Sequence, residues 1–465
     1  MIYFLSIWTL KSVERRVLCQ KKFKILKKLA WRLLCHNCAN ILNYLKKILR
    51  SPEFVEKHRN SSTAFTRNRK LPFHLLFCFI INFVKGSYQA ELDRFFQAIT
   101  SSSIAKRAVS KAAFAKARMK LKYEAFIELN QCLVNEFYAV FRCRTWHGFQ
   151  LLAIDGTTLT LPKISEISDH FGVWNGRQGD PCPKARASQL YDPLNHLTIN
   201  AVINPKGIGE RQQAKHLLPE VLVNSLILLD RGYPAFWLFK LIHCRHGQFC
   251  ARISRQWKEV RHFVNSGKSE KVIEFKAGAA AKDCKELGLD IEPMKLRLIR
   301  VELSSGEIEV LITSLIDKTT YPHNIFCDLY HARWPVEEDY KTMKCRIEME
   351  AFTGKTALSV YQDFYANVFA KNLVAMLSFP ARVALETAGI KEKHVHQINF
   401  THALGKAKNL VALLFQRTSR TIKKLIQEFI AIVLQTTEPV RPGRKYPRNI
   451  RIVKKPYYQN YKPIC

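Results

Sequence analysis

Apolar positions recur at helical spacing through the first 145 residues. The segment from Val13 to Leu34 places apolar side chains on one face and Lys and Arg on the other, which is typical of an amphipathic helix. The segment from Val109 to Phe126 offers Ser110 as an N-cap for an Ala-rich helix. The apolar run Leu71–Val84, about fourteen residues, is too short to span a bilayer and predicts a buried helix.

Near residue 148 the pattern changes to short buried strands that alternate with helices. We expect the first strand to end at Asp155 in "AIDGTTLTLP", and another, Leu226–Leu229, to end at Asp230 before a turn into a helix. Such alternation is typical of an α/β layer. From 248 to 320 the runs are β-like and include a hairpin that turns at 304–306. Helices return at about residue 321, so an α/β core interrupted by a β insertion is predicted.

The charge balance points to a polyanionic partner. The 465-residue chain carries 74 Lys and Arg against 38 Asp and Glu, a formal net charge of +36. Such an excess usually faces nucleic acid or an acidic membrane surface. Lys111, Lys116 and Arg118 follow Ser110 on a helix that resembles a recognition helix, although an ordinary surface helix has the same pattern. The C-terminal tail interleaves Arg and Lys with Tyr446, Tyr457, Tyr458 and Tyr461; it could neutralise phosphates and stack on bases, or be a disordered basic tail.

Three carboxylates are candidates for chemistry. Asp155 and Asp230 stand at predicted strand ends, where open α/β sheets bind ligands, and a charged acid there is costly unless it is paired or bound to a cation. The third is Glu337, in "YHARWPVEEDYKTMK", which runs from Tyr330 to Lys344. On a continuous helix Tyr330, Arg333, Glu337 and Lys344 would lie within about 60° of one another.

Taken alone, that stripe favours an ordinary ion pair four residues apart, and Pro335 must lie in a first helical turn or cause a kink. With the two aspartates it completes an oxygen-rich set that suits Mg²⁺, and paired ions can catalyse an in-line phosphodiester displacement.

At these residues the chain resembles insertion-sequence transposases of the DDE type, in the group marked by a Tyr-Arg-Glu-Lys signature. The spacing of Tyr330, Arg333, Glu337 and Lys344 matches that signature, as do the contexts "AIDGTTLTLP" and "LLDRGYP" of the two aspartates. The resemblance implies a ribonuclease H-like core interrupted by a β-strand insertion. It also implies that Asp155, Asp230 and Glu337 hold two Mg²⁺ ions, for which Mn²⁺ can substitute.

Further expectations follow from the same resemblance. Tyr330, Arg333 and Lys344 would grip DNA phosphates, and a flipped base would stack on Trp257 or Trp334, a choice that stays open. The predicted regions are 1–145, helical, basic and binding DNA ends; 146–247, first part of the core; 248–320, β insertion; 321–385, second part of the core with the catalytic Glu; and 386–465, helical and basic, for DNA binding or dimerisation.

The predicted function is cut-and-paste transposition, in which the enzyme cleaves the element ends and transfers the strands into target DNA. The partners would be double-stranded DNA, as terminal inverted repeats and target, and a second copy of the chain on paired ends, with no membrane. Thirteen cysteines, an odd number without a framework, suit a reducing compartment, so we expect a cytoplasmic, nucleoid-associated protein. The alternatives are a DNA-binding protein with a decayed site, a Mg²⁺-dependent nuclease without strand transfer, and a basic membrane-surface protein.

Overall fold

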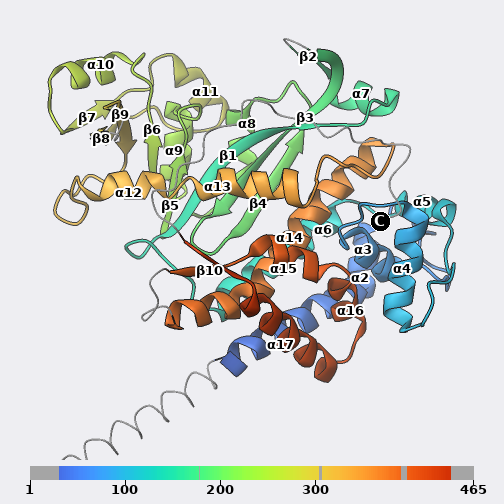
Figure 1. The fold of residues 1–465 in the computed structure, drawn as a ribbon. Helices are drawn as coiled ribbons and strands as arrows, with labels where there is room; N and C mark the ends of the chain where they lie inside the picture. Colours follow the sequence, from blue (N-terminus) through green and yellow to red (C-terminus); the bar gives the residue numbers. More distant parts are fainter. Residues whose placement is uncertain (1–30, 177–178, 303–305, 389–394, 441–465) are drawn as a thin grey trace, which may run out of the picture.

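The protein is built around one mixed β-sheet flanked by helices (Figure 1). The computed structural model describes residues 31–176, 179–302, 306–388 and 395–440. The proposed C-terminal tyrosine stretch and most of the first amphipathic segment lie outside these ranges. The nine-stranded sheet has the order β2-β3-β1-β5-β6-β9-β8-β7, and β4 pairs with β3. Its strands are β1 (Gln150–Thr160), β2 (Val173–Gly176), β3 (Gly179–Asp192), β4 (Leu197–Asn204), β5 (Ser225–Leu229), β6 (Gln248–Arg252), β7 (Glu270–Phe275), β8 (Met294–Glu302) and β9 (Ile308–Thr313).

The middle of this sheet has the topology of a ribonuclease H-like core. Strands β4, β3 and β1 are antiparallel neighbours, and β5 and β6 continue the sheet parallel to β1. Helix α8 (Glu210–Leu217) connects β4 to β5, and α9 (Phe236–Cys244) connects β5 to β6. The strand β5 is buried on both sides over its whole length, as expected of a central parallel strand.

The β insertion extends the same sheet instead of forming a separate one. Strand β9 pairs antiparallel with β6, β8 with β9, and β7 with β8. The predicted hairpin is therefore present as β8 and β9, although most of its turn lies outside the described residues. Two short helices, α10 (Lys258–Asn265) and α11 (Ala281–Glu286), accompany these strands, and η1 (Gly278–Ala280) precedes α11.

Most of the helices come before the first core strand or after the β insertion in the sequence. After a helix through 31–50 come α2 (Pro52–His58), α3 (Phe73–Ile80), α4 (Tyr88–Thr100), α5 (Lys111–Arg118), α6 (Glu124–Val140) and α7 (Ser165–Phe171). After the insertion come α12 (Ile325–His331), α13 (Pro335–Lys341), η2 (Thr342–Arg346), α14 (Ala357–Ala388), α15 (Phe400–Ala407), α16 (Leu410–Gln416) and α17 (Ser419–Gln435), with a small sheet of β10 (His396–Ile398) and β11 (Thr437–Pro439).

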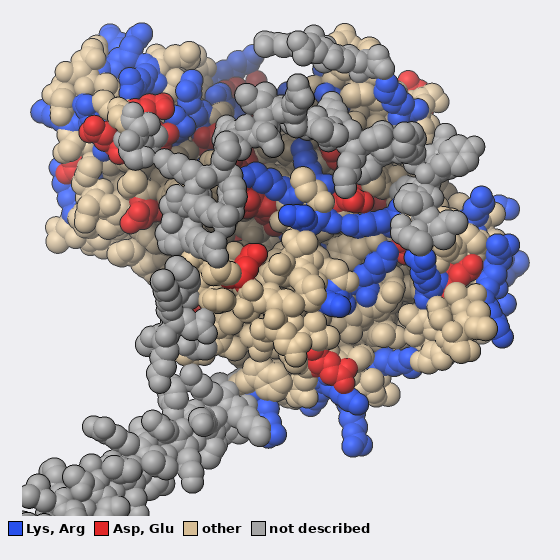
Figure 2. Space-filling model, in the orientation of Figure 1, with Lys and Arg blue, Asp and Glu red and all other residues tan. Residues whose placement is uncertain are grey.

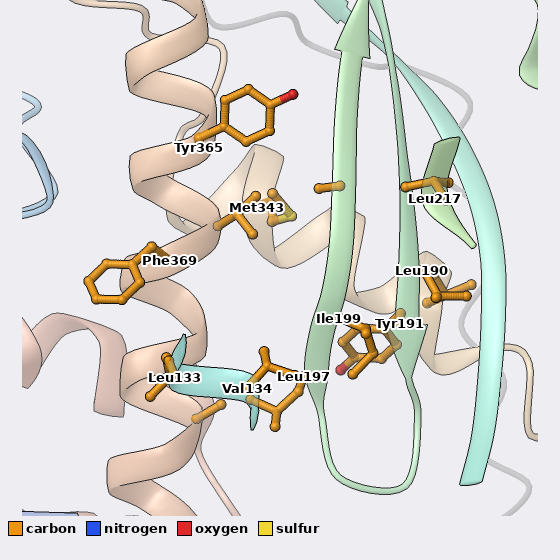
Figure 3. Packing of buried hydrophobic residues seen from close by; sticks show 14 of the residues in the cluster. Leu133, Val134, Leu190, Tyr191, Leu197, Ile199, Leu217, Met343, Tyr365 and Phe369 are labelled. Atoms are coloured by element: carbon orange, nitrogen blue, oxygen red, sulfur yellow. The ribbon is translucent and has the colours of Figure 1, made fainter. Parts of the chain in front are cut away.

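The long helix α14 covers one face of the sheet, and α8 covers the other. Tyr365 of α14 points toward β3 and β4, whereas Phe369 points away from the sheet and packs against Phe77 of α3 (Figure 3). Leu217 of α8 and Leu190 lie on the opposite side of these strands (Figure 3). Among the described residues, α14 is the one helix long and apolar enough to cross a membrane, and 78% of its apolar window is buried inside the protein. That burial is what a core helix requires.

Two expectations about local structure need correction. Strand β1 does not end at Asp155 but continues to Thr160, because β3 pairs with it as far as that residue. The signature segment is not one continuous helix: α12 ends at His331, a turn follows, and α13 begins at Pro335. Pro335 thus lies in a first helical turn, one of the two positions expected of it, where its missing N–H costs nothing.

Candidate active site

Strand register brings the two aspartates together. In the parallel pair of β1 and β5, Ile154 lies opposite Leu229. Asp155 and Asp230 are the next residues on each chain, so both lie where the two strands part. Both side chains are partly buried. This is the carboxyl edge of a parallel pair, the usual ligand position in sheets of this kind.

The signature segment lies across the same place. Helix α13 packs against β1, and the Tyr340 hydroxyl donates a hydrogen bond to the carbonyl oxygen of Asp155 at 2.9 Å. On α12, the Tyr330 hydroxyl donates to Asp230 Oδ1 at 3.2 Å. The three acids therefore converge from β1, from the end of β5 and from α13.

Charges at this junction act on Asp155 directly. Its pKa is raised from the ordinary 3.8 to about 6, chiefly because burial disfavours the carboxylate. The negative charges of Glu337 and Asp230 raise it further, while Arg333 and the Gly156 backbone N–H oppose the rise. Mutual repulsion of this kind is relieved when a cation binds between the acids.

Arg333 is the cation at the centre of the site. Its Nη2 donates to Glu337 Oε1 at 2.5 Å, and its guanidinium carbon lies 5.7 Å from the centre of the Tyr330 ring. The residue is only 7% exposed, yet Nε and Nη1 are buried without a hydrogen-bond partner. Buried donors are rarely left unpaired in folded proteins, so these two N–H groups indicate a ligand oxygen that the described part of the chain does not supply.

Lys344 lies farther along, on η2. Its Nζ donates to the carbonyl oxygen of Thr158 on β1 at 2.7 Å, and burial lowers its pKa. Because of the break at 332–334 and the change to η2 at Thr342, the four signature residues lie on four short segments: Tyr330 on α12, Arg333 in the turn, Glu337 on α13 and Lys344 on η2. The two tryptophans differ in exposure: Trp334 is 40% exposed, and Trp257 is half-buried against Phe275.

A second candidate surface lies on the N-terminal helices. A groove of about 980 Å³ separates the loop before α3 from α5. The cations along its lining are Arg67, Arg69, Lys70, Lys116 and Lys120, and its lining residues include no Asp or Glu. Figure 2 shows Lys and Arg side chains gathered at the edge of the molecule where α4 and α5 lie. The loop cations were not among the predicted DNA-binding residues, although the run "RNRK" at 67–70 is an adequate signal.

The structure separates the three cations predicted on α5. Ser110 caps the helix as expected by accepting a hydrogen bond from the Ala113 N–H, and Lys111 and Lys116 are exposed. Arg118 points the other way: it is 4% exposed, and its Nη2 donates to Asp363 of α14 at 2.6 Å. Its guanidinium also donates to Gln362 Oε1, to Thr353 Oγ1, to the carbonyl oxygen of Ser359 and to the Tyr88 hydroxyl of α4. This position does not suit a DNA contact, and we assign Arg118 a structural role.

The donors at the sheet edge suit a hard divalent ion, because all three are carboxylates. Within the described ranges, no group of three or more His, Cys, Asp or Glu side chains is arranged to hold a metal ion. At this site Glu337 is engaged by Arg333 and Asp230 by Tyr330. A metal would therefore have to exchange with these two partners.

A ribonuclease H-like sheet with three acids at its edge, beside a buried guanidinium with unpaired donors, suits metal-dependent chemistry on a phosphodiester. Comparison with known proteins gives the family. Residues 146–373 match the family model "Transposase DDE domain". The chain is 23% identical over 415 residues to the transposase InsG for insertion sequence element IS4 of Escherichia coli K12, across 86% of this chain and 90% of that protein. The chain is thus a DDE transposase of the insertion-sequence type, an enzyme that acts on DNA with a divalent metal.

Two further proteins are similar to this chain, one over a shorter aligned stretch and the other at lower sequence identity. The putative transposase InsZ of Escherichia coli K12 is 24% identical over 203 residues, which is 43% of this chain and 59% of that protein. A solved structure, a piggyBac transposase synaptic complex with hairpin DNA, aligns with 87% of each chain at 11% identity and a TM-score of 0.45. That likeness is too slight to carry an inference.

Proposed function

We propose that Asp155, Asp230 and Glu337 hold two Mg²⁺ ions and that the enzyme cleaves DNA at the element ends and transfers the strands into target DNA. The observation that carries this proposal is the buried Arg333 guanidinium, whose Nε and Nη1 have no partner although they lie beside the acids. A phosphate oxygen of the scissile strand would satisfy them, and Arg binds phosphate with paired N–H donors.

When bound, divalent ions supply an activated attacking oxygen and stabilise the oxygen that leaves. The chain supplies placement. In the proposal, a DNA phosphate replaces Glu337 as the hydrogen-bond partner of the Arg333 guanidinium, and Glu337 is then free to bind metal. Tyr330 would leave Asp230 and contact the DNA backbone in the same exchange, and Lys344 would add a positive charge beyond it. The ion pair between Arg333 and Glu337 thus belongs to the DNA-free state of the site.

The basic groove on the N-terminal side supports a second part of the proposal. We infer that Lys111 and Lys116 on α5, with the cations of the loop 67–70, hold the phosphate backbone of the terminal inverted repeat. The groove lining carries positive charge without an opposing acid, which is what sequence-independent backbone contacts need. Two protomers would pair the two ends, with regions 1–145 and 386–465 contributing DNA binding or dimerisation. In this proposal residues 146–247 and 321–385 form the catalytic core and residues 248–320 form the insertion. The protein would act in the cytoplasm, at the nucleoid.

One experiment tests the catalytic assignment. Asp155→Asn should abolish Mg²⁺-dependent nicking and joining of a labelled element-end duplex while leaving its gel shift intact, because a metal ligand changes and the basic surface does not. Asp169→Asn, an exposed acid on α7, is the matched control and should behave as wild type. A wild-type protein that shifts the duplex but never nicks it would indicate a decayed site, and cuts without joined products would indicate a nuclease.

A further inference from the structure

A fourth acid stands at the sheet edge, on the element that joins β4 to β5. Helix α8 begins at Glu210. Its first turn is fixed to the loop after Asp230, because Arg211 Nε donates to the carbonyl oxygen of Gly232 at 2.8 Å. It is also fixed to β3, because Gln213 Nε2 donates to the carbonyl oxygen of Arg186 at 3.1 Å. The start of α8 is therefore held between β3, which pairs with the Asp155 strand β1, and the loop that follows Asp230.

Glu210 lies against the glycines that follow the aspartates. A Cβ atom added to Gly156 would lie 3.3 Å from both Cγ and Cδ of Glu210, and one added to Gly232 would lie 4.0 Å from Glu210 Oε2. Successive residues of a strand face opposite sides, so Glu210 approaches β1 from the side opposite to the Asp155 side chain. Because Gly156 has no side chain, Glu210 can approach the strand this closely; Ser188 Oγ of β3 lies 3.2 Å from the same Cβ position.

The surroundings of Glu210 contain acids and an unpaired hydroxyl. Glu210 is exposed and makes no hydrogen bond or ion pair within the described part of the chain. Tyr233 is 2% exposed, and its hydroxyl has no hydrogen-bond partner among the residues that the structure describes. Burial raises the pKa of Tyr233, and the negative charges of Asp155, Glu210 and Asp230 raise it further, so all three carboxylates act electrostatically on one buried hydroxyl.

We propose that Glu210 is a fourth carboxylate of the metal centre, which binds the ions together with Asp155, Asp230 and Glu337. This inference rests on the proposed metal-dependent function. Two divalent ions and Arg333 carry five positive charges, whereas Asp155, Asp230 and Glu337 carry three negative charges. A fourth carboxylate brings the total closer to balance before the phosphate of the DNA arrives. Mg²⁺ also demands six oxygens per ion, and Glu210 supplies further oxygens from the side of β1 that the other acids do not cover.

The test is Mn²⁺ binding by the full-length protein saturated with a pre-cleaved element-end duplex, measured by calorimetry, so that no turnover is needed and DNA has displaced the partners of Glu337 and Asp230. Glu210→Gln should weaken Mn²⁺ affinity by about tenfold or more, the usual range for a residue that supports a metal site. Glu220→Gln, an exposed acid beyond the end of α8, should leave the affinity unchanged. Gly156→Ala, whose methyl would lie 3.3 Å from the Glu210 carboxyl carbon, should weaken binding in the same direction. Circular dichroism checks that each variant is folded.

Asp155→Asn run in parallel separates the two ideas. If Asp155→Asn weakens Mn²⁺ binding and Glu210→Gln does not, the fourth ligand is wrong and the metal centre stands. If neither variant changes Mn²⁺ binding, the proposed metal centre fails and this inference fails with it. Loss of affinity in both, with Glu220→Gln unchanged, is the expected result.

Discussion

The position of Glu337 depends on a buried ion pair two residues further along α13. Asp339 Oδ2 accepts a hydrogen bond from Lys371 Nζ of α14 at 2.5 Å and another from Gln189 Nε2 of β3 at 3.0 Å. Asp339 is 7% exposed and Lys371 is fully buried. Lys371 also donates to Thr198 Oγ1 of β4 at 2.7 Å. Helix α13 has only seven residues, so this network ties it to the sheet and to α14.

Removing one partner should destabilise the protein by several kcal/mol. Asp339→Asn leaves the buried Lys371 ammonium without its counter-charge, and Lys371→Met leaves the Asp339 carboxylate in the same state. Breaking a buried pair from one side costs about 3–5 kcal/mol, whereas replacing both partners by neutral groups is often close to neutral. The double variant Asp339→Asn/Lys371→Met should therefore cost far less than the two single variants added together.

Urea unfolding followed by tryptophan fluorescence measures each free energy of unfolding, and a double-mutant cycle gives the coupling. The same helix provides the control: Lys341 and Glu338 also approach to 2.5 Å, but their side chains are 60% and 54% exposed. Lys341→Met should cost at most about 1 kcal/mol. Single variants of the buried pair that cost no more than Lys341→Met, or a double variant whose cost equals the sum, would refute the reasoning.

Two further expectations concern Arg333 and Asp155. Arg333→Ala should weaken binding of the element-end duplex by about tenfold or more, since charged hydrogen bonds contribute about 1.5–3 kcal/mol each, and change Mn²⁺ affinity less; unchanged transposition would contradict its role. Because the pKa of Asp155 is raised from 3.8 to about 6 in the folded protein, stability without metal should fall as pH rises between these values, and Mn²⁺ affinity should fall about tenfold per pH unit below about 6. Calorimetry at several pH values checks the second effect, and Asp155→Asn should remove both.

The sequence predicted the parts of the site that depend on local pattern. Short buried strands that end near an Asp, followed by Gly, are visible in a single sequence, and the register of β1 and β5 then brings Asp155 and Asp230 together. The continuation of β1 past Asp155 was not visible, because it depends on pairing with β3. The break between α12 and α13 was missed for a related reason. A helical wheel assumes one continuous helix, and Pro335 is equally compatible with a start and with a kink.

Residues whose roles depend on distant partners could not be assigned from the sequence. Arg118 looked like a surface cation because its neighbours on α5 are basic, but its partner Asp363 is 245 positions away. Lys371 and Asp339 meet across 32 positions, on elements whose approach only the fold determines. Glu210 carries no motif of its own and is brought to the site by the glycines that leave room for it.

The helix α14 connects the two surfaces that the proposed reaction needs. Asp363, which binds Arg118 of the groove helix, and Lys371, which binds Asp339 beside Glu337, both belong to it. Eight residues of α-helix separate them by only about 12 Å. Both contacts are buried and charged, and each would be costly to break from one side. A duplex held in the groove would therefore be aligned with Glu337 through one rigid helix. In that arrangement the register between the bound repeat and the scissile phosphate is set by the core of the protein.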